Sequence, residues 1–60
     1  MDRLSISEKV LIELRRKSIS RDELADKLGV NLMTVNRRIE SNAWKPIEVY
    51  FMKNKLNFDL

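Results

Sequence analysis

The stretch Arg21–Glu40, RDELADKLGVNLMTVNRRIE, holds two helical patterns separated by the single glycine of the chain, Gly29. Ser20 stands before the first pattern and Glu23 follows three residues later, which is the spacing of a capping box. The first helix is therefore expected over residues 21–28. It ends at Gly29 because glycine adopts left-handed backbone angles at little cost.

The second helix of this stretch is expected over residues 31–41, with Asn31 as a favourable N-cap. Val35 and Ile39 lie one turn apart and define its inward face, and Ala25 in the preceding helix is small enough for a close crossing. This spacing of a small residue, a glycine and two aliphatic residues is typical of a helix-turn-helix. In that motif the second helix is held at a steep angle and presented outward.

Further helical patterns flank the helix-turn-helix segment, residues 21–40. Upstream, Ser5 and Glu8 fit another capping box, although Ser7 could equally be the cap. Apolar residues recur there at helical spacing, which predicts a helix from about residue 5 to residue 17. Downstream, Asn42 suits the left-handed position after a helix, and Pro46 suits the first turn of a fourth one. The last residues alternate apolar and polar over a stretch too short to assign. We expect an all-α fold, a compact four-helix domain over residues 1–60 with room for a short fifth element.

Composition excludes several classes of protein. Sixty residues suffice for one small domain but not for a deep substrate cleft, and no apolar run approaches the roughly 20 residues of a membrane span. Without cysteine or histidine, disulfides, thiolate metal sites and the commonest general base are absent. We therefore expect a cytoplasmic, nucleoid-associated protein that is not an enzyme, with no cofactor, metal or small-molecule ligand. The net charge of +3 mildly favours a polyanionic partner.

Three segments together resemble a known family. Leu11–Arg15 (LIELR), Leu24–Val30 (LADKLGV) and Val35–Glu40 (VNRRIE) are similar in order and spacing to the Cro and lambda-repressor (XRE) type of helix-turn-helix. The resemblance covers about residues 6–56 and includes the loop around Trp44–Pro46. It implies a compact domain of four or five helices that binds operator DNA as a dimer.

The outward face of the helix expected over residues 31–41 follows from its periodicity alone. At about 100° per residue, Arg37 points directly away from Val35 and Ile39. Arginine suits guanine O6 and N7, asparagine suits adenine N6 and N7, and a methionine can contact a thymine methyl. The expected base contacts are Asn36, Arg37, Met33 and Thr34. The alternative is that these residues form a solvated helix face without a partner. For Met33 the sequence favours neither a DNA contact nor simple exposure to solvent.

Cations and helix starts on the flanks are expected to contact the DNA backbone. Arg21 and Asn31 stand where free amide groups and the helix dipole already favour anions. The expected phosphate contacts are Arg21, Asn31, Arg38, Lys27, Arg16 and Lys45. The run Arg15–Lys17 also suits the negative end of a helix dipole, and both roles can hold at once.

The C-terminal residues 46–60 carry more apolar side chains than one small core is expected to use. Trp44 and Phe51 are expected to pack within one chain. The expected homodimer surface comprises Tyr50, Leu56 and Phe58, with the tail pairing as a strand or inserting into the partner.

These observations predict a sequence-specific DNA-binding transcriptional regulator. The specific prediction is a Cro-like repressor of a phage or mobile element. It is expected to bind a palindromic operator as a homodimer, with the helix over residues 31–41 in the major groove. Leu32 is expected to pack near the core, but the apolar pair Leu32–Met33 leaves an alternative open. In that alternative the same fold is a protein-interaction module, such as an antitoxin or adaptor.

Overall fold

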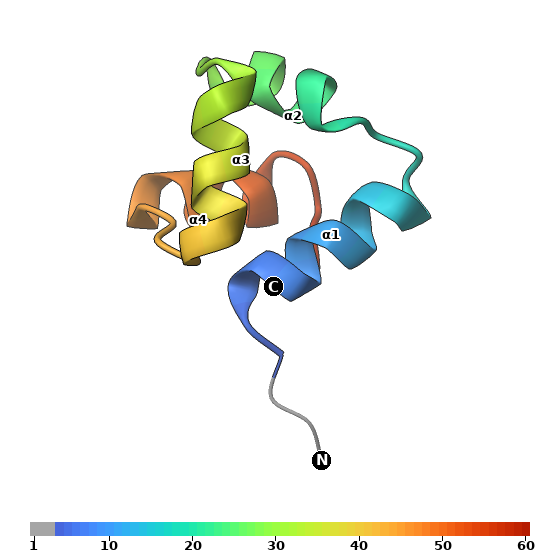
Figure 1. Cartoon of the computed structure of the whole chain (residues 1–60). Coiled ribbons are helices and arrows are strands. Elements are labelled where there is room, and N and C mark those ends of the chain that lie inside the picture. The colour runs from blue at the N-terminus through green and yellow to red at the C-terminus, as the bar shows by residue number, and fades with distance from the viewer. Residues whose placement is uncertain (1–3) are drawn as a thin grey trace.

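The computed structural model describes residues 4–60, and Figure 1 shows how its helices pack. Within that range the chain forms four helices and no strand: α1 (Ile6–Arg16), α2 (Arg21–Leu28), α3 (Leu32–Ser41) and α4 (Pro46–Asn54). The all-α, four-helix expectation is confirmed. None of these helices has the length and apolar character that a bilayer span requires.

Local side-chain chemistry sets the helix starts. Ser5 Oγ accepts a hydrogen bond from the backbone N–H of Glu8, and the Glu8 carboxylate accepts one in return from the N–H of Ser5, which completes a capping box. Ser20 and Asn31 each accept from a backbone N–H three residues on, at the starts of α2 and α3. Pro46 opens α4, where its missing N–H costs nothing.

Left-handed residues end α2 and α3, as the sequence predicts. Gly29 follows α2 with φ +74°, and Asn42 follows α3 with φ +55°. Each reverses the chain sharply enough for the next element to fold back. The two turns therefore fix the path of the chain on both sides of α3.

Every helix contributes to one hydrophobic core. Its fully buried large side chains come from all four helices, namely Val10, Leu24, Val35 and Met52. Because the helices are short, each supplies only one or two buried apolar residues. A core this small needs further apolar volume from outside the helices.

The C-terminal tail supplies that volume. Phe58 is only 3% exposed, and its backbone N–H donates to the carbonyl of Met52. Leu56 and Leu60 pack against the same core, and the tail returns beside α1, where Lys9 Nζ donates to the Leu60 carbonyl at 3.1 Å (Figure 1). The placement of Phe58 on a homodimer surface is therefore corrected: the side chain fills the core of its own chain. The tail forms no strand within the described residues.

Candidate nucleic-acid interface

The turn between α2 and α3 is closed by backbone hydrogen bonds. The N–H of Val30 donates to the Ala25 carbonyl at 3.0 Å, and the N–H of Gly29 donates to the Asp26 carbonyl at 3.2 Å. These bonds satisfy carbonyls at the end of α2, as a left-handed glycine allows. Asn31 then caps α3, which begins at Leu32, so only three residues separate the two helices.

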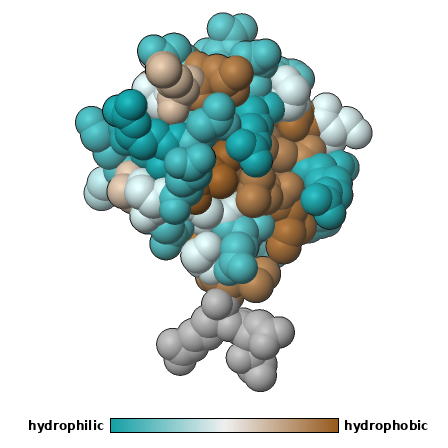
Figure 2. Space-filling view, viewed as in Figure 1, coloured by the Kyte–Doolittle hydropathy of each residue, from teal (hydrophilic) through white to brown (hydrophobic). Residues whose placement is uncertain are grey.

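The two faces of α3 differ as the periodicity predicts. Val35 is fully buried and Ile39 packs half-buried against the core. On the opposite side Arg37 is exposed and Met33 is 67% exposed. Figure 2 shows the visible surface of α3 to be mostly hydrophilic, whereas the larger apolar area lies over α1. The outer face of α3 is therefore free of the chain's own packing at Met33 and Arg37.

Leu32 departs from its expected place. It is the first residue of α3 and is 38% exposed rather than packed in the core stripe. Together with Met33 it gives the start of α3 an exposed apolar character.

Asn36 is half-buried and held by a residue of another helix. Nη1 of Arg21, the first residue of α2, donates to Asn36 Oδ1 at 2.8 Å. The structure thus joins a predicted phosphate contact to a predicted base contact. Local sequence carries no signal for this pair, since fifteen positions separate the two residues and only the crossing of α2 and α3 brings them together.

Thr34 takes part in the N-terminal cap of α3. Its hydroxyl donates to Asn31 Oδ1 at 3.0 Å, and its backbone N–H donates to the same oxygen at 2.9 Å. Thr34 is half-buried, so of the four predicted base contacts it is the one most engaged within the domain.

Arg38 takes part in an ion pair between two helices. Its Nε donates to both carboxylate oxygens of Glu48, at 2.9 and 3.2 Å, and the two side chains are only 20% and 10% exposed. This ion pair ties α3 to the first turn of α4. The ion pair gives Arg38 a structural role, because a buried ion pair is costly to break, and its phosphate role stays a prediction.

Glu48 has a role that the sequence patterns do not predict. Its carboxylate also accepts from the backbone N–H of Lys45 at 3.0 Å. Burial raises the pKa of Glu48, but the hydrogen bonds from Arg38 and Lys45 and the nearby positive charges outweigh burial, so the pKa is lowered overall. A glutamate three residues after a helix start is a recognisable capping signal, and it identifies the Lys45 bond but not the one to Arg38.

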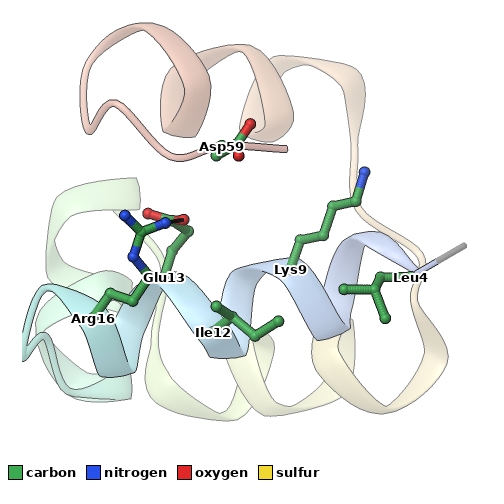
Figure 3. A pocket seen from close by; sticks show the side chains of 6 residues that line it. All are labelled: Leu4, Lys9, Ile12, Glu13, Arg16 and Asp59. Carbon is green, nitrogen blue, oxygen red and sulfur yellow. Dashed lines mark hydrogen bonds and ion pairs between the residues drawn. The ribbon is translucent and has the colours of Figure 1, made fainter. Parts of the chain in front are cut away.

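Arg16 lies beside the C-terminal tail. It donates to Glu13, whose side chain is 4% exposed, at 3.0 Å, and Lys17 Nζ lies 3.7 Å from the same carboxylate. Figure 3 shows Glu13 and Arg16 on the side of α1 that faces Asp59, around a pocket of about 180 Å³. Arg16 is therefore partly neutralised by an acidic neighbour.

The remaining predicted contacts are exposed. Of the cations predicted to bind phosphate, Arg21, Lys27 and Lys45 are exposed, as is Asn31 at the start of α3. On α4 Tyr50 is 61% exposed, whereas Leu56 beyond that helix is half-buried. Exposed Ile47 lies one turn from Tyr50, and the two form an apolar strip on α4.

A family comparison agrees with this geometry. A model of winged helix-turn-helix DNA-binding domains matches residues 3–41, which include all of α1, α2 and α3. Since the match spans more than half of the chain, the chain belongs to the winged helix-turn-helix DNA-binding family. No similar curated protein and no similar solved structure was found.

The family match stops at the end of α3. Residues 42–60 continue as α4 and a tail that packs into the core, and they contain no strand from which a wing could be built. The match establishes the helix-turn-helix as a DNA-binding domain, while the Cro and lambda-repressor type stays a finer prediction.

Proposed function

We propose that this chain is a sequence-specific transcriptional regulator that inserts α3 into the major groove of double-stranded DNA. The observation that carries the proposal is the contrast between the two faces of α3. Val35 anchors one face in the core, while Arg37 and Met33 are exposed on the other. An α-helix fits the major groove, where side chains reach the base edges.

The proposed contacts follow from exposure and hydrogen bonding. Arg37 and Met33 read bases, and Asn36 reads a base from beside Arg21. Thr34 contributes mainly its methyl group, because its hydroxyl proton is donated to Asn31 Oδ1. The proposed phosphate contacts are Arg21, Asn31, Lys27 and Lys45. Arg16 is a weaker candidate because Glu13 shares its charge.

The finer proposal is a Cro-like repressor that acts as a homodimer on a palindromic operator. The exposed strip of Ile47 and Tyr50 on α4 supports a second copy as the partner, because exposed apolar side chains at helical spacing favour association. Two recognition helices of such a dimer enter successive major grooves about 34 Å apart. Blocking a promoter is then the simplest mode of regulation.

The test is selection of bound sequences from a random duplex pool by the full chain. The expected result is an enriched site whose two halves are related by dyad symmetry. Arg37→Ala is expected to lower the affinity for that site on the order of tenfold. Lys53→Ala, which removes one exposed cation from α4, is the matched control and keeps the sequence preference. A pool without any enriched sequence contradicts the proposal, and an enriched single half-site contradicts only the dimer.

A second candidate function rests on the exposed pair Leu32–Met33 at the start of α3. There α3 holds a protein partner, as in an antitoxin or adaptor. The salt dependence of binding distinguishes the two functions, since DNA binding through several phosphates weakens steeply between low and moderate salt. Changing Met33→Gln is expected to weaken a protein complex strongly, whereas it alters DNA preference at one base pair.

A further inference from the structure

The contact between Arg21 and Asn36 restricts what Asn36 can recognise. Arg21 opens α2, Asn36 lies in the middle of α3, and the 2.8 Å bond runs from Nη1 to Oδ1. Arginine only donates hydrogen bonds, so the side-chain amide must turn its oxygen toward the guanidinium. The Nδ2 amino group is thereby directed away from Arg21, which is what fixes the orientation of the amide.

Asparagine needs both ends of its amide to recognise adenine in the major groove. The oxygen accepts from adenine N6 while the amino group donates to N7. In this structure Asn36 Oδ1 already accepts from Arg21, whose positive charge also repels a second amino donor brought to the same oxygen. The adenine pairing is therefore weakened at this position.

The amino group of Asn36 still suits bases that present an acceptor. Guanine offers O6 and N7 and thymine offers O4, whereas adenine combines its N7 acceptor with the N6 amino donor and cytosine presents the N4 amino donor. The positive charge of Arg21 beside Asn36 favours these keto oxygens over amino groups. The pair as a whole is complementary to a keto edge.

We propose that Arg21 is a specificity-determining residue that makes Asn36 select guanine or thymine rather than adenine. The proposal rests on the DNA-binding function proposed above and adds the rule by which one base pair is read. Arg21 acts by orienting Asn36 and by its charge, so its removal changes which base is preferred and not only how tightly DNA is held.

The experiment compares sequences selected from a random duplex pool by four forms of the full chain. Asn36→Ala identifies the base position at which preference depends on Asn36. The unaltered chain is expected to enrich guanine or thymine at that position. Arg21→Ala is expected to shift the same position toward adenine, on the order of tenfold in the ratio of adenine to keto bases.

Lys27→Ala is the matched control, because it removes an exposed cation of the same helix that, within residues 4–60, makes no hydrogen bond to Asn36. It is expected to weaken binding to all sequences alike and to leave base preference unchanged. Circular dichroism of each variant confirms that the helices are retained.

The outcomes separate this inference from the proposed function. Adenine at the Asn36 position in the unaltered chain overturns the inference, as does a keto preference that survives Arg21→Ala. An enriched site with no position dependent on Asn36 also overturns it, while the DNA-binding proposal stands. If no form of the chain enriches any sequence, the proposed function fails and the inference fails with it.

Discussion

Arg37 and Arg38 are neighbours in sequence but occupy different sides of α3. Arg37 is exposed on the outer face, and Arg38 is bound to Glu48 with only a fifth of its side chain exposed. Residue type therefore does not decide whether an arginine of this helix faces DNA or holds the fold together. The decisive factor is a rotation of about 100° per residue relative to Val35.

The same negative charge placed on each side of α3 is expected to have very different effects on stability. Val35→Asp puts an unpaired carboxylate at a fully buried position, where its desolvation costs several kcal/mol. Total stability for a domain of this length is about 3–9 kcal/mol. We expect Val35→Asp to abolish the cooperative thermal transition seen by circular dichroism.

The matched control is Met33→Asp, which places the carboxylate on the exposed side of the same helix. Its free energy of unfolding is expected to lie within about 0.5 kcal/mol of that of the unaltered chain. If both variants unfold alike, the outer face of α3 is not free of packing, and the comparison fails.

The ion pair between Arg38 of α3 and Glu48 of α4 predicts a specific dependence of stability on pH. The pKa of Glu48 is lowered in the folded protein, so the folded state favours the ionised carboxylate. Its contribution is present at pH above the ordinary glutamate pKa and is lost as the pH falls through the lowered one. Glu48→Gln is expected to lower the free energy of unfolding by roughly 1.5–3 kcal/mol near neutral pH, and by less in acid.

Urea unfolding at a series of pH values measures this difference. Trp44 is a suitable reporter, because it is half-buried and its Nε1 donates to Ser7 Oγ at 2.9 Å. Glu40→Gln, at an exposed position of α3, is the control for removing one negative charge. A Glu48→Gln curve parallel to that of the unaltered chain at all pH values argues against the role given to this pair.

The two arginines can also be compared directly on DNA. Arg37→Ala is expected to change the free energy of unfolding by no more than about 0.5 kcal/mol. It is expected to make the free energy of binding to the specific site less favourable by about 1–3 kcal/mol. Arg38→Ala is expected to act first on stability, because it leaves Glu48 buried without its partner. Paired urea titrations and DNA-binding isotherms distinguish the two, and an Arg37→Ala variant that binds its selected site normally contradicts the assignment of the outer face.

These contrasts show which parts of the fold local sequence determines. The caps at Ser5 and Asn31 and the left-handed ends at Gly29 and Asn42 depend on neighbours within a few residues. The sequence predicts the last three of these and leaves the first open between Ser5 and Ser7. The inward direction of Val35 follows from periodicity alone.

Local sequence patterns do not predict contacts between distant segments. Phe58 was expected on a surface because a strand-like alternation in the tail does not reveal that the tail returns to the core. Likewise the partners Arg38–Glu48 and Arg21–Asn36 come from different helices, and their pairing depends on crossing angles that single-helix patterns do not specify. For the candidate site, the sequence therefore predicts which residues face outward but not which of them hold one another.

The smallest expected effect concerns the turn that sets α3 against α2. Gly29 has φ +74°, and a Cβ added there meets no atom within 4 Å, so the cost of Gly29→Ala is backbone strain alone. We expect a loss of about 1–2 kcal/mol in the free energy of unfolding. Gly29→Asn is expected to cost less, since asparagine tolerates left-handed angles and already does so at Asn42. Urea unfolding of the two variants tests this order, and equal losses point to a steric cause in place of the backbone angle.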